Sequence, residues 1–283
     1  MAFYTKIIRR FPQLGICFGL GILIISPIQA QERVSSVPKI AIIIDDVGHR
    51  SSDTRLQSLP VEVAFSILPD ADFATQQANI AQQGGRDIMI HMPMESLIPS
   101  QDLGNSPLLV SMPQDELEQT IAKALRKVPG AIGINNHMGS KFTQLKSTMA
   151  AFFTSLRAQN MDLFFVDSRT TAFTRAYQQA REHAIRAVER NVFLDHIDDE
   201  NAIAKEFERL IKKAKQEGSA LAIGHPNRQT LEYLQEHLPN VSDLGVELIS
   251  ISEYVALRQS IENNNHRATK TQERPPTDVE KAL

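Results

Sequence analysis

The stretch Lys39-Ile-Ala-Ile-Ile-Ile-Asp-Asp-Val-Gly-His49 decides the fold of this 283-residue chain. It is a largely β-branched apolar run that ends abruptly in two adjacent carboxylates, Asp45 and Asp46. A continuously apolar strand is typical of a parallel sheet that is covered on both faces, and α/β folds place their chemistry in the loops at the carboxyl ends of such strands. We therefore expect a buried first strand with a functional site at its end. The alternative, that both aspartates only solvate a turn, fits this stretch equally well when it is taken alone.

The first thirty residues differ from the rest of the chain. Lys6, Arg9 and Arg10 precede an apolar run over residues 14–25, and Ser26-Pro-Ile-Gln-Ala30 follows, which is the order of a secretory signal. We expect residues 1–30 to be removed on export and the mature protein to be secreted, in the periplasm. The apolar run is shorter than the ~20 residues that a membrane span needs, so an uncleaved anchor is the less favoured alternative.

Composition limits the mature chain to a self-supporting, mildly acidic domain. The single cysteine, Cys17, lies in the signal, so no disulfide framework is expected and a domain of this length must be held by its own core. Removing the signal takes three of the 30 Lys and Arg and none of the 33 Asp and Glu, which leaves a formal charge of −6. This charge argues against nucleic acid as a partner. Residues 259–283 are polar without an apolar period and predict a disordered tail.

Residues 37–258 alternate apolar strand-like runs with segments of helical period, which is typical of repeated βα units around a parallel sheet. We predict an α/β fold, a distorted (β/α) barrel of seven to eight parallel strands. A doubly wound open sheet is the alternative, but no Gly-rich phosphate loop follows the first strand, which counts against nucleotide binding. The predicted strand runs cover residues 40–44, 61–68, 87–90, 131–134, 163–166, 192–194, 220–223 and 246–251.

The sequence also predicts two helices and one long loop. Ser111 and Gln114 form a plausible capping box before apolar residues at helical spacing from Leu117 to Val128. A second helical pattern, residues 203–214, ends before Gly218, which suits a helix stop. The segment 95–112 is too irregular for a helix, and a long loop at a barrel mouth usually shapes a binding site.

Polar side chains follow several predicted strands, and parallel strands bring their carboxyl ends to one face. The coincidence of histidines and aspartates at that face is hard to assign to packing, although a structural role is the better interpretation of any one histidine. A carboxylate with two imidazoles suits zinc or a similar divalent ion, which lowers the pKa of a bound water from 15.7 toward ~7 and polarises a carbonyl. These strand ends present Asp45 and Asp46, His91 to Glu95, Asn135 to Ser140, Asp167 to Thr170, and Gly224 to Pro226.

The same residues carry a family resemblance over about residues 37–256. Asp45-Asp46 followed by Gly48 resembles the Asp-Asp-Gly motif of the polysaccharide deacetylases, with Val47 inserted, and Leu221-Ala-Ile-Gly-His225 matches their Leu-x-Ile-x-His motif. The middle motifs depart from most members, which have two histidines four apart, Arg-x-Pro-Tyr, and Asp-x-x-Asp-Trp. The corresponding segments here, His91-Met-Pro-Met-Glu95, Asn135-Asn-His-Met-Gly-Ser140 and Asp167-Ser-Arg-Thr170, are similar to the divergent branch of the family.

The resemblance implies a deacetylase-like barrel with roles for particular residues. It implies Asp45 as the base, Asp46 and His91 as metal ligands, and His225 as the acid. The third ligand stays open between Glu95, which holds the position of the missing histidine, and His137, which we favour slightly because a second carboxylate would reduce the Lewis acidity of the metal. Further candidates are Arg169, which would orient Asp45, and Asp167, which would hold His225 or Arg169; an ordinary turn ion pair explains these two equally well.

The sequence supports three alternative hypotheses of function. The first is a secreted, metal-dependent hydrolase that removes N-acetyl groups from a cell-wall or envelope glycan. The second is a non-catalytic glycan-binding or envelope-assembly protein on the same fold, which the altered middle motifs favour and the retention of Asp45 and His225 opposes. The third, a glycosidase that uses two carboxylates such as Asp45 and Asp167, is weaker because histidines dominate the set. The expected partner in the first two is a glycan.

Overall fold

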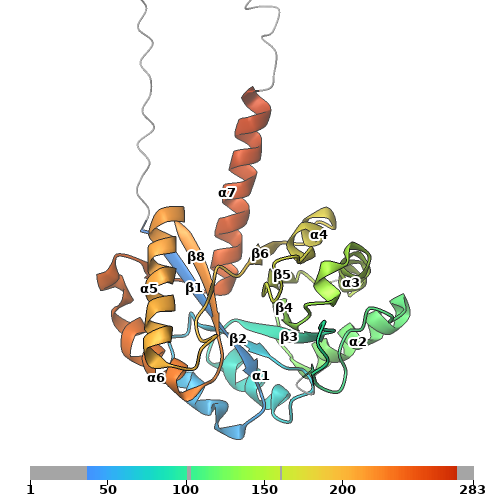
Figure 1. Ribbon diagram of the computed structural model, residues 1–283, viewed down its shortest axis with the longest axis horizontal. Coiled ribbons are helices and arrows are strands. Elements are labelled where there is room, and N and C mark those ends of the chain that lie inside the picture. Colours follow the sequence, from blue (N-terminus) through green and yellow to red (C-terminus); the bar gives the residue numbers. More distant parts are fainter. Residues whose placement is uncertain (1–36, 101–102, 160, 273–283) are drawn as a thin grey trace, which may run out of the picture. The chain divides into compact units, whose positions relative to one another are not determined.

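A curled parallel sheet forms the centre of the molecule in the computed structural model, which describes residues 37–100, 103–159 and 161–272 (Figure 1). Within these residues the sheet has nine strands in the order β6-β5-β4-β3-β2-β1-β8-β7, with β9 paired to β1. Every pairing is parallel. The strands are β1 (Lys39–Val47), β2 (Ala64–Ile67), β3 (Ile88–Met94), β4 (Gly133–Met138), β5 (Phe164–Asp167), β6 (Ala187–Glu189), β7 (Val192–Phe193), β8 (Ser219–Gly224) and β9 (Glu247–Leu248).

The two outer strands of this order, β6 and β7, are consecutive in the chain. Only Arg190 and Asn191 separate them. Because successive Cα atoms are about 3.8 Å apart, the ends of these strands lie within roughly 11 Å of each other, so the sheet must curl almost into a closed ring. No ladder joins β6 to β7 among the described strands. The prediction of a distorted (β/α) barrel is therefore confirmed, with an open seam at Arg190.

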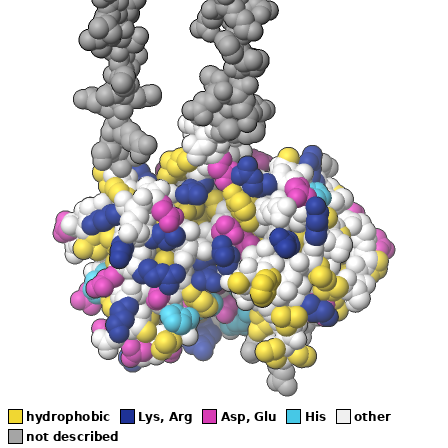
Figure 2. Space-filling model, turned by 45° about the horizontal axis from the view of Figure 1, so that its top comes forward, with side chains coloured by type: hydrophobic (Ala, Val, Ile, Leu, Met, Phe, Trp, Pro, Cys, Tyr) yellow, Lys and Arg dark blue, Asp and Glu magenta, His cyan; other side chains and the backbone are white. Residues whose placement is uncertain are grey.

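Helices cover the outside of the sheet, with α5 and α6 beside β1 and β8 and α2 to α4 beside β3 to β5 (Figure 1). Within the described residues no helix is both long and apolar enough to cross a membrane. On the face drawn in Figure 2, acidic, basic and apolar side chains are interspersed. The helices are α1 (Ala74–Gln83), α2 (Gln114–Lys127), α3 (Lys146–Ala158), α4 (Ala176–Glu182), α5 (Glu200–Glu217), α6 (Arg228–His237) and α7 (Ile251–Gln272), with 3₁₀ turns η1 (Ser51–Ser58), η3 (Phe142–Gln144) and η4 (Leu238–Leu244).

The alternation of side chains along β1 separates two buried clusters. Ile40, Ile42 and Ile44 belong to the large cluster that packs against the outer helices. Ala41 and Ile43 belong to a smaller cluster inside the barrel, which the first turns of α7 complete through Ile251 and other residues. Because side chains alternate with a period of two, Asp45 continues the inner row. The packing of β1 thus directs the Asp45 carboxylate toward the mouth of the barrel.

Several elements differ from the sequence prediction. Ser111 does not cap α2: the cap position is Pro113, and Gln114 donates instead to Ser155 Oγ on α3. Strand β6 was missed, because three residues with one buried side chain carry little pattern. The helix over residues 203–214 is confirmed as α5, capped by Asp199 and ended by Gly218 at φ 82°.

The termini give two further outcomes. The predicted signal, residues 1–30, lies outside the described residues. The predicted disordered tail, 259–283, is wrong over its first part, because α7 continues to Gln272. The packed first turns of α7 nucleate the helix, and adding residues to an existing helix costs little. Glu262 also ties this helix to α4 through Arg181 and Tyr177. Residues 273–283 lie outside the described part.

Candidate functional site

The site lies at the carboxyl ends of the strands, where the backbone is strained at three of them. Asp46, Met138 and Arg169 have φ values of 55°, 53° and 51°, a region that residues other than glycine rarely adopt. Asp46 is the last residue but one of β1, Met138 ends β4, and Arg169 comes two residues after β5. Strain of this kind persists only where the surroundings enforce it, and it concentrates at functional sites. At Asp46 the turn takes the side chain out of the strand's alternation, so both neighbouring carboxylates can face the barrel mouth.

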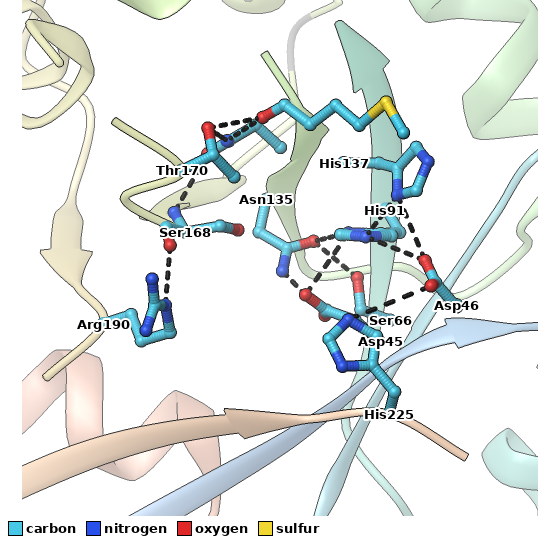
Figure 3. A network of polar contacts seen from close by, with 12 residues as sticks. Asp45, Asp46, Ser66, His91, Asn135, His137, Ser168, Thr170, Arg190 and His225 are labelled. Atoms are coloured by element: carbon cyan, nitrogen blue, oxygen red, sulfur yellow. Dashed lines mark hydrogen bonds and ion pairs between the residues drawn. The ribbon is translucent and has the colours of Figure 1, made fainter. Parts of the chain in front are cut away.

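Three side chains from three strands converge on one point (Figure 3). Asp46 Oδ1 lies 3.2 Å from His91 Nε2 and 3.1 Å from His137 Nδ1, and the two nitrogens are 3.1 Å apart. Ligands about 2.0–2.1 Å from a tetrahedral zinc ion are separated by roughly 3.3 Å, so the triangle has the size of one face of a zinc site. Asp46 Oδ1 is buried without an aligned hydrogen bond. The group Asp46, His91 and His137, which we call the tripod, therefore fits a divalent ion.

The amide of Asn135 fixes the orientation of His91. Asn135 Oδ1 lies 2.8 Å from His91 Nδ1 and also accepts a hydrogen bond from Ser66 Oγ. Because an amide oxygen only accepts, the proton of a neutral His91 is assigned to Nδ1, and the lone pair of Nε2 faces the tripod. A metal-binding histidine usually has such a partner for its other ring nitrogen.

The electrostatics of the tripod favour positive charge. Burial opposes ionisation of Asp46, but the adjacent His137 and His91 imidazoles outweigh it and hold the pKa of Asp46 below its ordinary range. Burial likewise disfavours a charged His91, yet the carboxylates of Asp45 and Asp46 outweigh it and raise the pKa of His91. The site thus attracts a cation, and a metal ion would compete with the proton on His91.

Asp45 lies beside the tripod and is connected to it through Asn135, which also contacts His91. The Asp45 side chain is 3% exposed, and its Oδ1 accepts a hydrogen bond of 2.8 Å from Asn135 Nδ2. Its Oδ2 is 3.6 Å from His91 Nδ1. Burial raises the pKa of Asp45, against the opposing influence of His91 and His225. A buried carboxylate of this kind is a stronger base than an exposed one.

His225 faces the tripod from the end of β8 and is held by Asp195, a residue that the sequence analysis missed. Asp195 Oδ1 is 2.9 Å from His225 Nδ1, and its Oδ2 accepts from His225 N at 2.6 Å. Burial lowers the pKa of His225, but the hydrogen bond to Asp195 and the surrounding carboxylates outweigh it and raise the pKa to about 9. The signal for Asp195 was its position directly after the apolar run 192–194. That signal is ambiguous, because acids are also ordinary at the start of a helix, and Asp199 caps α5 four residues later.

Three of the predicted site residues have other partners. Glu95 contacts Lys141 and accepts from Val110 N at 2.7 Å, outside the tripod. Arg169 pairs with Glu189 at 3.0 Å rather than orienting Asp45. Asp167 accepts from Arg169 N and Thr174 Oγ1, so it holds the Arg169 backbone and not His225. These contacts correct the roles predicted for Arg169 and for Asp167 at His225.

The distance along β3 explains the position of Glu95. His91 lies in the middle of β3, which stays extended to Met94. Four residues of extended strand span about 13 Å, so His91 and Glu95 cannot hold the same ion. His137, by contrast, lies on β4 in register with Pro93, next to His91. The geometry thus favours His137 for the third ligand.

A cavity of about 620 Å³ opens over the tripod. The predicted loop 95–112 forms part of its wall through Ser96, Leu97 and Ile98, and Leu97 and Ile98 are 61% and 80% exposed. The opposite wall includes Arg190 and Phe193 from the seam of the barrel. The cavity therefore offers mainly apolar contact with polar groups concentrated at its base, as is usual for small-molecule sites.

Comparisons with known proteins found a matching family, related sequences and a similar structure. Residues 42–255 match the family of divergent polysaccharide deacetylases. The chain is 37% identical over 204 residues to the uncharacterized protein YibQ of Escherichia coli K12, covering 72% of this chain and 63% of that protein. It is 38% identical over 216 residues to an uncharacterized protein of Haemophilus influenzae, covering 75% of each. An uncharacterized protein of Agrobacterium tumefaciens C58 has a similar structure, with a TM-score of 0.72 at 18% identity over 77% of this chain and 89% of that one. This last likeness shows the fold alone.

The tripod predicts which substitutions remove metal. Asp46→Ala, His91→Ala and His137→Ala should each lower zinc affinity by more than the ~10–100-fold that loss of a supporting residue costs, because each removes a direct ligand. Glu95→Gln should keep zinc bound. Isothermal titration with zinc on the folded variants measures this. Wild-type affinity in all three tripod variants would show that the site is not a metal centre, and loss of zinc in Glu95→Gln would restore Glu95 as a ligand.

Proposed function

The chain belongs to the divergent polysaccharide deacetylase family, and we propose that it is a secreted, metal-dependent hydrolase that removes N-acetyl groups from a cell-wall or envelope glycan. The observation that carries the proposal is the tripod flanked by a buried carboxylate, Asp45, and a histidine held by a second carboxylate, His225. Asp46, His91 and His137 would hold the ion, and zinc suits this donor set. When bound, the ion supplies Lewis acidity at the amide carbonyl.

The residues of the chain account for the proton transfers that amide hydrolysis needs. A water oxygen bonds to the acetyl carbon and its proton passes to Asp45, whose burial makes it a strong base for a carboxylate. As the carbon–nitrogen bond breaks, His225 donates a proton to the leaving amine. With its pKa raised to about 9, His225 carries that proton at neutral pH. Acetate and a free amino sugar are the products.

The supporting contacts favour catalysis over glycan binding alone. Asn135 holds Asp45, and Asp195 holds His225 with two hydrogen bonds. Burying a carboxylate and an imidazole costs free energy unless each is paired, and glycan binding requires neither a base nor an acid. Partners that hold both groups in place are what general acid–base catalysis needs.

Export is part of the proposal, because the basic, apolar and small-residue order before Ala30 is that of a secretory signal. We expect the exported protein to begin at Gln31. Intact-mass measurement of protein recovered from the periplasm tests this. A mass that includes residues 1–30 would support the membrane-anchored alternative.

Replacing the proton-transfer residues should separate catalysis from metal binding. Asp45→Asn and His225→Gln should each keep zinc but lower acetate release from N-acetylated oligosaccharides by on the order of 10²–10⁴, the usual scale for positioned proton transfer. Release of acetate by the zinc-loaded protein, and its loss on chelation, are measured on the same substrates. A zinc-loaded wild type that binds these glycans and releases no acetate would support the non-catalytic envelope protein.

Asp195 is a positioning residue whose role shows in the pH profile. Asp195 raises the pKa of His225, so Asp195→Asn should lower that pKa and move the alkaline limb of kcat/KM from near 9 toward the ordinary histidine range of about 6.5. Asp198→Asn, which removes one negative charge three residues away, is the matched control and should leave the limb in place. An alkaline limb that stays fixed in Asp195→Asn would mean that His225 does not act as the acid.

A further inference from the structure

Arg190 is a fixed cation in the wall of the site cavity. It lies at the seam between β6 and β7 and is the one Lys or Arg among the described residues that line the cavity. Its Nε donates to Ser168 O at 2.6 Å, its Nη2 donates to Arg169 O at 3.1 Å, and its guanidinium lies 4.7 Å from the ring centre of Phe193. These contacts fix the position of the guanidinium without neutralising it.

No carboxylate of the described residues lies within 4.0 Å of this guanidinium. The two backbone contacts use two of its five N–H donors, and no other hydrogen bond to a described residue is formed. Burial lowers the pKa of Arg190, and Asp45 is the first acid that opposes this effect. A half-buried charge without a counter-ion is costly, which makes an external anion a favourable partner.

Ser168 provides a second polar group at the same wall. The residue is 5% exposed, lines the cavity, and its Oγ is buried with no hydrogen-bond partner in the described structure. Its backbone is held at both ends, because Ser168 N donates to Asn136 Oδ1 and Ser168 O accepts from Arg190. Figure 3 shows its side chain directed from the Arg190 side toward the centre of the site. A buried hydroxyl without a partner calls for a ligand atom or an ordered water.

We propose that Arg190 and Ser168 form a subsite for an anionic substituent of the substrate, a carboxylate or a phosphate ester, beside the N-acetyl group that the tripod receives. The inference rests on the proposed function, since it assigns the class of glycan. The guanidinium fork matches the oxygen geometry of both anions, and the Ser168 hydroxyl adds one donor. Leu97, Ile98 and Phe193 line the same cavity and would give the sugar rings apolar contact beside this anion subsite.

Direct binding measurements test this subsite apart from catalysis. The mature, zinc-loaded chain carrying Asp45→Asn, so that ligand is not consumed, is titrated with three tetrasaccharides: neutral chitotetraose, a hyaluronan tetrasaccharide with carboxylates, and chitotetraose bearing a 6-phosphate. We expect at least one anionic ligand to bind about 10- to 100-fold more tightly than the neutral one, with an advantage that falls as salt rises. The carboxylate and phosphate arms identify which anion the subsite takes.

Substitutions test whether Arg190 and Ser168 cause the preference for anionic ligands. Arg190→Gln should remove the advantage of the anionic ligand while neutral chitotetraose binds as before, and Ser168→Ala should reduce that advantage about 2- to 10-fold. Arg186→Gln, which removes a cation paired with Asp162 on the neighbouring β5–β6 edge, is the matched control and should keep it. If Arg190→Gln does not fold, Ser168→Ala decides, because an unchanged advantage there would overturn the proposal.

The failures of the two proposals can be told apart. Equal binding of neutral and anionic tetrasaccharides, or an anionic preference that survives Arg190→Gln, overturns the subsite and leaves deacetylation of neutral glycans standing. Binding of none of the three ligands overturns the subsite together with the glycan substrate itself. A preference that depends on Arg190 but with no acetate released by the parent protein would support the subsite on a glycan-binding protein.

Discussion

The hydrogen bonds of the Asn135 side-chain amide are the contacts on which the rest of the site depends. The amide oxygen accepts hydrogen bonds from His91 Nδ1 and Ser66 Oγ, and the amide nitrogen donates one to Asp45. One residue on β4 therefore connects side chains from β1, β2 and β3. Because an amide has a fixed acceptor and a fixed donor end, it sets the tautomer of His91 and keeps Asp45 as an acceptor at the same time. The ligand and the base cannot be repositioned independently.

The barrel supplies the precision that this network requires. Ala41 and Ile43 pack inside the barrel against the start of α7, and the same alternation carries Asp45 to its mouth. His91 follows the inner residue Met89 in the same way, two positions further along β3. Side chains that continue a packed row have little freedom, so the site is held by the core rather than by its loops. Because no ladder joins β6 to β7 among the described strands, Arg190 lies between the two strand ends and lines the cavity.

Sequence reasoning predicted the fold and most residues of the candidate site, because both depend on hydrophobic period and on strand ends. Apolar runs gave the strands, and residues just after them gave Asp45, Asp46, His91, His137 and His225. It failed where the signal was short or ambiguous. Strand β6 has three residues, and Asp195 stands among other acids at the start of a helix. Arg190 could not be found by pattern, since what sets it apart is its position in space: no carboxylate of the described residues forms an ion pair with it.

The candidate third ligand shows how the conformation of one strand decides which residues can meet at a site. A histidine four residues after another can share an ion with it only where the chain turns, and here β3 remains extended through Pro93 to Met94. Pro93 lacks an N–H, but its carbonyl still accepts from Leu108 N, which ties the start of the long loop to the strand. Position 95 is thereby carried away from the tripod and becomes an anchor of the loop, through Glu95 and Lys141. In the proposed metal site, His137 on the neighbouring strand would take the third ligand position, and the strained turn at Met138 ends β4 directly after it. The altered middle motifs are therefore consistent with a metal site rebuilt across two strands rather than one that has been lost.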